Sequence, residues 1–217
     1  MVKIEHVLPA DIEKNSFAII TKELSEMGKE LPAEYENIIK RVIHTTADFE
    51  YADTMYFSKG VKDIIFDALK KGAHIVTDTN MALSGINKKA LAGLGGQVHC
   101  FMADPEVMKE AKERGCTRAT VSMEWASRLQ EPVIFAIGNA PTALLSLYEL
   151  MQNGYQPTAV IGVPVGFVNV VASKELILES GVPCIINRSR KGGSNVAAAI
   201  CNALLYELDE TRGNRTV

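Results

Sequence analysis

The sequence predicts an α/β domain in which helices cover both faces of a five-stranded parallel sheet. Five short apolar runs are rich in β-branched residues and do not alternate with polar residues, as expected of strands that are buried on both faces. Helical patterns separate these runs, and strands that alternate with helices form parallel sheets. The predicted strands are His74–Asp78, Val98–Met102, Pro132–Gly138, Thr158–Val165 and Pro183–Asn187.

Helices are predicted before and between these strands. Three are expected in the N-terminal third, over residues 12–28 with Gly28 as the stop, over residues 31–43, and from Gly60 onward. In the third of these, apolar residues at 61, 64, 65, 68 and 69 share one helix face. The later helices are expected within Met81–Leu94, and at Pro105–Gly115, Thr117–Leu129, Ala140–Asn153, Ser173–Ser180 and Ser194–Leu208.

Composition excludes several classes of function. The 217 residues contain no obvious linker, so one domain over residues 1–217 is expected. The formal net charge of −3 does not favour binding to nucleic acid or to a membrane surface. Four cysteines form no C-x-x-C pair and no zinc-site spacing, so reduced cysteines and no metal are expected. No signal peptide or membrane helix is expected, and the predicted location is cytoplasmic.

The segments that follow the predicted strands are where a ligand is expected, because open parallel sheets bind ligands beyond the carboxyl ends of their strands. The most informative segment is Arg188–Ser194, which places three cations beside a Gly-Gly-Ser turn at the start of the last helix. Such a turn favours an anion, although a solvated turn with a Ser N-cap is the simpler alternative. The order of residues is not that of a Walker loop.

Two further features have both a structural and a functional interpretation. Gly138–Thr142 makes a tight exit from a strand, with Asn139 as the predicted N-cap and free backbone N–H groups facing the crevice. His44 follows the apolar end of the second predicted helix. Histidine can exchange a proton near neutral pH, but a histidine in this position is more often structural than catalytic. No catalytic triad or dinucleotide fingerprint is present.

Taken together, the motifs resemble those of the precorrin-8X and cobalt-precorrin-8 methylmutase family over nearly the whole chain. The resemblance depends on their order and spacing, since each stretch alone is weak. The matching stretches are Ser16–Ile20, Val42–His44, Thr117–Arg118, Ala136–Leu144, Pro164–Val168 with Ser173–Lys174, and Arg188–Ser194.

The resemblance implies a flavodoxin-like three-layer fold with extra N-terminal helices, and a homodimer with a tetrapyrrole site near the subunit interface. It implies that His44 is the catalytic acid–base residue. The residues that it implies for substrate binding are Ser16, Arg118, Asn139, Lys174, Arg188 and Arg190. The chain departs from the family at Asn169–Ala172, which lacks the usual acid, and at Lys191, which replaces an apolar residue of some members and is expected to add charge to the site.

The implied reaction is the migration of a methyl group from C-11 to C-12 of a corrin precursor in cobalamin biosynthesis, giving hydrogenobyrinate or cobyrinate. It needs no cofactor, and His44 would protonate the macrocycle. The carboxylate side chains of the macrocycle explain why a net-acidic protein needs a local cluster of cations. Two alternatives remain open: a phosphosugar- or nucleotide-using transferase with Arg188–Ser194 as a phosphate cradle, and a corrinoid-binding or regulatory module without activity. The motifs do not distinguish a cobalt-containing substrate from a metal-free one.

Overall fold

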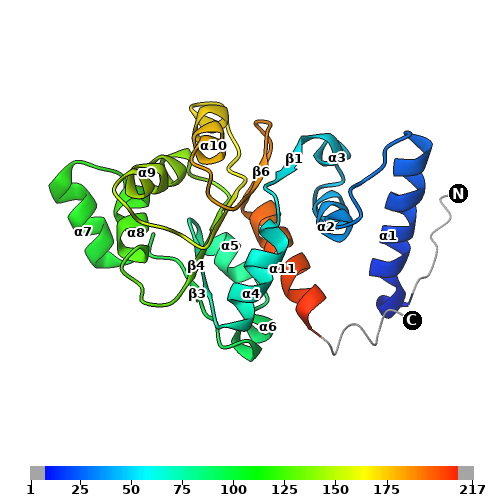
Figure 1. The fold of residues 1–217 in the computed structure, drawn as a ribbon, viewed down its shortest axis with the longest axis horizontal. Helices are drawn as coiled ribbons and strands as arrows, with labels where there is room; N and C mark the ends of the chain where they lie inside the picture. The colour runs from blue at the N-terminus through cyan, green and yellow to red at the C-terminus, as the bar shows by residue number, and fades with distance from the viewer. Residues whose placement is uncertain (1–7, 210–217) are drawn as a thin grey trace, which may run out of the picture.

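The computed structural model describes residues 8–209, and they form a six-stranded sheet with helices on both sides (Figure 1). The strands lie in the order β1-β6-β5-β4-β2-β3. Their bounds are β1 Met55–Phe57, β2 His74–Thr77, β3 Val98–His99, β4 Val133–Ile137, β5 Ala159–Gly162 and β6 Cys184–Asn187.

All five predicted strands are present and mutually parallel, but the expectation of a purely parallel, five-stranded sheet is wrong. β1 pairs antiparallel with β6, with Met55 opposite Asn187 and Phe57 opposite Ile185. The sequence signal of β1 is weak because the strand has three residues, all only partly buried. A short edge strand of this kind also covers backbone groups of β6 that would otherwise be open to pairing.

The order of the five parallel strands sets the position of the binding crevice. In chain order they lie 2-1-3-4-5, which is a common order of doubly wound folds. The direction in which strands are added reverses between β2 and β4. In such sheets the crevice lies at this reversal, outside the carboxyl ends of the strands. The crevice is therefore expected beside the segments that follow β2, β4, β5 and β6.

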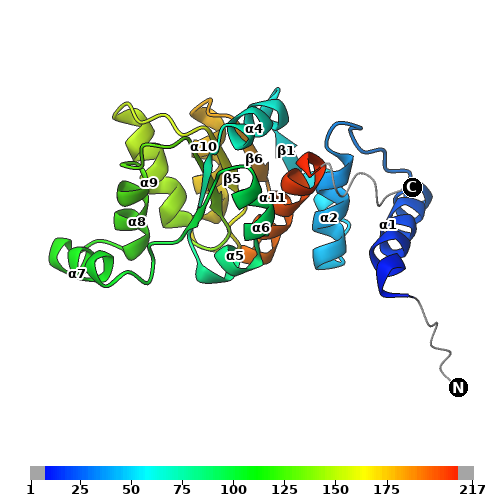
Figure 2. The same cartoon turned by 90° about the horizontal axis from the view of Figure 1, so that it is seen from below.

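The helices cover the sheet in two layers, each with its own apolar core (Figure 2). Neighbouring residues of β4 point to opposite faces: Ile134 and Ala136 pack with α2, α4 and α11, whereas Phe135 and Ile137 pack with α8 and α9. The helices are α1 Pro9–Glu26, α2 Glu36–Thr46, α3 Tyr51–Thr54, α4 Val61–Lys70, α5 Asn80–Gly85, α6 Lys88–Gly93, α7 Pro105–Arg114, α8 Arg118–Ala126, α9 Pro141–Gln152, α10 Val170–Glu179 and α11 Ser194–Leu208.

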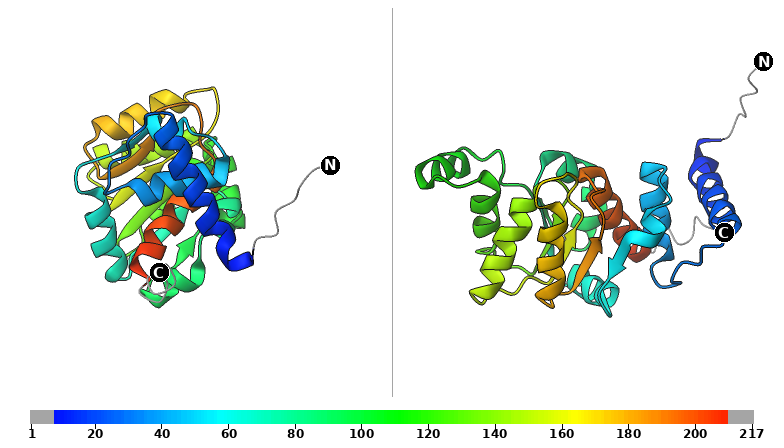
Figure 3. Two further views of the ribbon diagram at one scale, coloured as in Figure 1. Left: turned by 90° about the vertical axis from the view of Figure 1, so that its right-hand side faces the viewer. Right: turned by 90° about the horizontal axis from the view of Figure 1, so that it is seen from above.

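The N-terminal helices extend the molecule at one end. α1 ends before Gly28, which has a positive φ of 67° as its predicted role as a stop requires. α2 starts at Glu36, five residues later than predicted, because the segment that begins at Pro32 makes a turn in which the Tyr35 N–H donates to the Pro32 carbonyl. α1 stands beside α2 at the edge of the body (Figures 1 and 3).

The remaining composition-based expectations concern membranes and cysteines. Within residues 8–209, no helix combines the length and the apolar character that crossing a membrane requires. The four cysteines are free thiols, and Cys184 and Cys201 are buried in the core.

Candidate functional site

The segments that follow the parallel strands meet at one edge of the sheet, as predicted. A Cβ atom on Gly138, after β4, would lie 2.7 Å from both the carbonyl oxygen of Gly193 and the Cα of Ser194, before α11. Thr79, after β2, contacts Ser194 through a 2.7 Å hydrogen bond between their hydroxyl groups. These contacts leave no room for a side chain at position 138. Residues from three loops therefore form one continuous rim.

The buried carboxylate of Asp78 holds the start of α9. It accepts hydrogen bonds from the backbone N–H groups of Gly138 at 2.9 Å, Asn139 at 2.8 Å and Ala140 at 2.5 Å. Burial raises the pKa of Asp78, and these backbone hydrogen bonds oppose that effect because they stabilise the ionised form. The prediction that Asn139 is the N-cap is wrong, since Ala140 occupies that position and makes no side-chain cap. The N–H groups predicted to be free are taken by Asp78.

Sequence reasoning did not single out Asp78, which it placed at the end of the predicted strand His74–Asp78. An acidic residue directly after a fully buried strand is the only signal that the sequence offers. Its partners lie 60 to 62 positions away. Since an N-terminal helix end attracts anions, Asp78 occupies the place that a ligand phosphate takes in many doubly wound proteins.

The second part of the rim is the arginine loop, which we define as residues 188–193 between β6 and α11. Arg188 and Arg190 are exposed, and among the described residues neither forms an ion pair with a carboxylate. The Arg188 guanidinium lies 4.3 Å from the centre of the Tyr56 ring, and that of Arg190 lies 5.7 Å from the centre of the Phe167 ring. Their charges thus remain available to an anionic ligand.

Apolar side chains stand beside these arginines. Phe167 is 84% exposed and Val168 is 78% exposed, which is unusual for large apolar residues of a folded chain. Their segment is joined to the arginine loop by a hydrogen bond from the Gly166 N–H to the Arg190 carbonyl at 3.1 Å. The rim therefore offers both cationic and apolar contacts on neighbouring loops.

Lys174 lies beneath the arginine loop instead of on its surface. Its side chain is fully buried in α10, and its Nζ donates to the carbonyl oxygens of Ser189 at 2.6 Å and Lys191 at 3.1 Å. Burial lowers the pKa of Lys174 to about 8. The predicted contact between Lys174 and a substrate stays a prediction, whereas the contacts that the structure gives it hold the backbone of the loop.

Lys191 does not add free charge to the site, contrary to expectation. Its Nζ forms ion pairs with Asp48 at 2.5 Å and Glu50 at 2.8 Å. Asp48 lies in the segment that follows α2, the helix that carries His44. The two carboxylates neutralise the lysine, so the net cationic character of the rim comes from Arg188 and Arg190.

His44 is exposed in the last turn of α2, and it precedes two residues that line an open cavity of about 430 Å³. The two residues that follow it, Thr45 and Thr46, line this cavity together with the arginine loop. The full lining is Thr45, Thr46, Asp48, Tyr51, Val165, Lys191, Gly192 and Asn195. The fold thus brings the segment with His44 to the arginine loop, although these parts lie far apart in the sequence.

Ser16 lies near His44, whereas Arg118 does not. The ring of Phe17, the neighbour of Ser16 in α1, is 5.7 Å from the imidazole of His44, measured between centres. The Ser16 hydroxyl donates to the Ile12 carbonyl at 2.8 Å. Arg118 begins α8, toward the opposite end of the molecule from α2 (Figures 1 and 2), and its contact is a long 3.4 Å hydrogen bond to the Met102 carbonyl.

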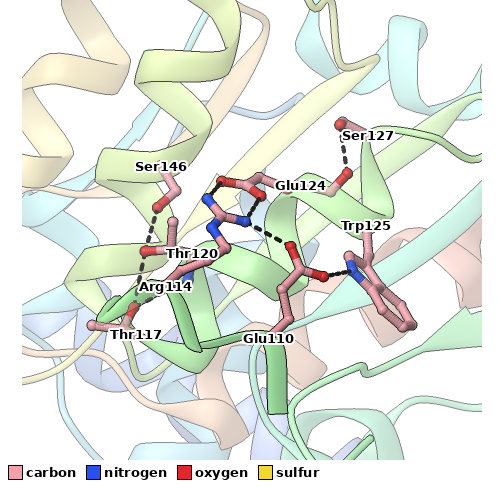
Figure 4. A network of polar contacts seen from close by, with 8 residues as sticks. All are labelled: Glu110, Arg114, Thr117, Thr120, Glu124, Trp125, Ser127 and Ser146. Carbon is pink, nitrogen blue, oxygen red and sulfur yellow. Dashed lines mark hydrogen bonds and ion pairs between the residues drawn. The ribbon is translucent and has the colours of Figure 1, made fainter. Parts of the chain in front are cut away.

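A polar network fixes the helix that carries Arg118 (Figure 4). Arg114 of α7 bridges Glu110 and Glu124, and it thereby ties α7 to α8. Thr120 in the first turn of α8 accepts a hydrogen bond from Ser146 of α9 at 3.1 Å. These contacts hold α8, the helix that Arg118 begins, against α7 and α9. The described residues contain no cluster of three or more His, Cys, Asp or Glu side chains that would suit a metal ion.

Fold and site together define a doubly wound α/β protein whose carboxyl-edge rim suits an anionic, partly apolar organic ligand. The comparisons specify the family. The model of the precorrin-8X methylmutase family matches residues 11–207, and the chain belongs to that family.

Individual relatives agree with this membership over most of their length. The chain is 46% identical to the cobalt-precorrin-8 methylmutase of Salmonella typhimurium, covering 93% of this chain and 97% of the relative. It is 38% identical to the precorrin-8X methylmutase of Pseudomonas aeruginosa, covering 90% and 94%. The crystal structure of precorrin-8X methylmutase from Thermus thermophilus superposes with a TM-score of 0.81 at 36% identity, covering 90% and 96%.

Proposed function

We propose that this protein is a methylmutase of cobalamin biosynthesis that moves a methyl group from C-11 to C-12 of precorrin-8, giving hydrogenobyrinate or cobyrinate. The reaction is an isomerisation of one substrate. Its substrate combines an apolar macrocycle with several carboxylate side chains. Binding therefore requires cationic groups beside apolar surface.

The observation that carries the proposal is a pair of arginines on the rim that have no carboxylate partner among residues 8–209. Arg190 lies over the ring of the exposed Phe167, which precedes the exposed Val168, and Arg188 lies over the ring of Tyr56, in a protein of net negative charge. Arginine binds carboxylates through its planar fork, and exposed apolar side chains offer a surface to a macrocycle. Membership of the methylmutase family supports assigning this ligand class to the rim.

We further propose separate roles for the site residues. His44 donates a proton to the macrocycle, at a ring nitrogen, and so favours the rearranged and conjugated product. Its exposure in the last turn of α2 supports this role, because a proton donor must reach its ligand. Ser16, Asn139 and Arg118 contact the substrate. Lys174 is proposed to act through the arginine loop, since its Nζ is bound to that loop's carbonyl oxygens.

A phosphosugar- or nucleotide-using transferase is less well supported. In many doubly wound proteins a ligand phosphate binds at the N-terminus of a helix near the strand reversal. Here the N–H groups before α9 donate to Asp78. A phosphate at this position would have to displace a carboxylate that belongs to the protein itself. The transferase would therefore have to bind its phosphate at the arginine loop, and membership of the methylmutase family favours a corrin precursor there.

The decisive experiment is to incubate the purified protein with precorrin-8X and, separately, with cobalt-precorrin-8, and to follow the absorption spectrum. The proposal predicts conversion of at least one form to its methyl-shifted product without added cofactor. Binding of both forms without any spectral conversion would instead identify a corrinoid-binding module. Magnesium-dependent binding of a nucleotide would favour the transferase. Comparing the two substrates also determines whether the natural one contains cobalt.

We also propose that the protein is a homodimer. Apolar residues along α1 are exposed, among them Ile12 at 52% and Ile19 at 56%. These two residues are seven positions apart and therefore lie on the same face of the helix. Burying this face against a second copy would remove an apolar surface from water. Light scattering should give twice the mass of the 23.6 kDa chain at micromolar concentration. A monomeric mass across that range would contradict the proposal.

A further inference from the structure

Lys191 joins the two parts of the site that the proposed function requires to act together. Its backbone belongs to the arginine loop, and its Nζ contacts Asp48 and Glu50, which follow the helix that carries His44. We propose that Lys191 is a positioning residue that fixes His44 relative to Arg188 and Arg190. We call this set of contacts, Lys191 with Asp48 and Glu50, the Lys191 bridge. The proposal rests on the proposed function.

On the helix side, short-range contacts tie the acceptors of the bridge to the end of α2. Ala47 adopts a left-handed conformation with φ 53°, and its N–H donates to the Ile43 carbonyl at 2.7 Å. Asp48 then accepts the Glu50 N–H at 3.0 Å through its other carboxylate oxygen. The Asp48 carboxylate, four residues after His44, therefore has a defined position relative to the last turn of α2.

On the loop side, the backbone of Lys191 is equally well held. Its carbonyl oxygen accepts from Lys174 Nζ at 3.1 Å and from Asn187 Nδ2 at 2.8 Å, and its N–H donates to the Ser189 hydroxyl at 3.1 Å. Both ends of the bridge are thus anchored. Asp48 and Lys191 both line the cavity of about 430 Å³, so the bridge forms part of its wall.

The charges favour a positioning role for Lys191 over a role in binding the substrate. Its hydrogen bond to Asp48 holds the pKa of that carboxyl below its usual value, and the two carboxylates raise the pKa of Lys191. Both partners are therefore ionised at neutral pH. A substrate carboxylate that competed for Lys191 would have to replace two carboxylates already in contact with it. Arg188 and Arg190 meet no such competition.

The test uses single-turnover conversion at saturating substrate, with whichever of precorrin-8X and cobalt-precorrin-8 the wild-type protein converts. Lys191→Met removes the charge but keeps much of the chain length, and Lys191→Arg retains the charge. The double variant Asp48→Asn, Glu50→Gln removes the acceptors and leaves the lysine in place. Affinity for the methyl-shifted product is measured on the same samples. The matched control is Lys62→Met, which breaks the ion pair between Lys62 of α4 and Glu207 of α11 and the hydrogen bond from Lys62 to the Glu34 carbonyl.

If the bridge positions His44, Lys191→Met should slow the saturated reaction about tenfold, since a displacement of ~1 Å can cost up to ~100-fold in rate. Product affinity should change by less than about twofold, because the binding arginines remain. The acceptor double variant should show the same loss, and combining it with Lys191→Met should add nothing further. Lys191→Arg should retain most of the rate, and Lys62→Met should retain all of it.

Other results overturn the proposal. Weaker product binding with an unchanged saturated rate would make Lys191 a binding cation. Wild-type rates in every variant would mean that the core alone positions α2. A wild-type protein that converts neither substrate would overturn the proposed function, and this inference with it. Melting temperatures should stay close to wild type, because partly exposed ion pairs contribute little to stability.

Discussion

Two helices begin at the same rim of the sheet, α9 after β4 and α11 after β6, and the structure gives their N-termini opposite electrostatic surroundings. The start of α9 already holds an anion, the buried carboxylate of Asp78. The start of α11 follows a loop whose exposed arginines form no ion pair within the described residues. A glycine-rich turn before a helix therefore does not by itself identify a ligand site. What distinguishes the two ends is whether the protein supplies the anion itself.

The largest expected effect tests whether the part of the site that contains the arginine loop and His44 carries out the chemistry. His44→Asn should lower single-turnover conversion by ~10²–10⁴-fold, the usual contribution of a positioned acid. Product affinity should be retained, because the arginines are unchanged. Stopped-flow absorption measures the rate, and titration with product measures the affinity. Near-native conversion by the folded variant would eliminate the acid–base role and leave positioning as the source of catalysis.

The next effect concerns the start of α9, where the carboxylate of Asp78 accepts the backbone hydrogen bonds. Asp78→Ala leaves three backbone N–H groups near α9 without their acceptor, and each unsatisfied buried donor costs about 1–3 kcal/mol. The free energy of unfolding should fall by about 4 kcal/mol in urea denaturation. The matched control is Asp104→Ala, which removes the cap of α7 and one N–H hydrogen bond, with an expected loss of about 1 kcal/mol. Equal losses would show that Asp78 is an ordinary helix cap.

A smaller effect is a pH dependence of stability, which comes from Lys174, the buried lysine beneath the arginine loop. Because the pKa of Lys174 in the folded protein is about 8, below its usual value, folding at neutral pH carries the cost of burying a charge. The unfolded chain binds more protons between pH 8 and about 10.5, so stability should rise with pH in that window. Across this pH window, the free energy of unfolding of the wild-type protein should rise by up to about 3 kcal/mol relative to that of Lys174→Met.

Chemical denaturation at several pH values measures this difference, with the exposed Lys112→Met as the control, which should show none of it. A parallel pH dependence of wild type and Lys174→Met would mean that Lys174 keeps its charge in the folded state across the window. In that case the arginine loop would rest on a permanent cation.

The smallest effect separates substrate binding from catalysis at the arginine loop. Arg190→Ala should weaken product binding about tenfold, with the saturated rate nearly unchanged, because a carboxylate far from the migrating methyl group is bound equally in ground and transition states. Wild-type affinity should also fall with added salt. Arg128→Ala, an exposed arginine after α8, is the matched control. Unchanged affinity with lost turnover would place Arg190 in the chemistry instead.

The sequence by itself determined the features that depend on local pattern. Four of the five parallel strands are fully buried and leave continuous apolar runs, so they were predictable, as were the loops at their carboxyl ends. The partly buried β3 also lies within its predicted run, Val98–Met102. Gly28 and Gly60 adopt the positive φ angles that their places at helix ends require. The resemblance to the methylmutases was equally visible, because it rests on the order and spacing of short stretches along the chain, from Ser16 to Ser194.

Tertiary structure alone decided how the charged groups of the rim are used. Asp78 meets its partners across 60 residues, and Lys191 meets Asp48 across 143, so no local pattern reports either contact. Lys174 is followed directly by an acidic residue in the sequence, yet it is fully buried. β1 exists as a strand because β6 offers it a free edge. Charge and residue type can be read from a sequence, but pairing and burial depend on which distant segments the fold brings together.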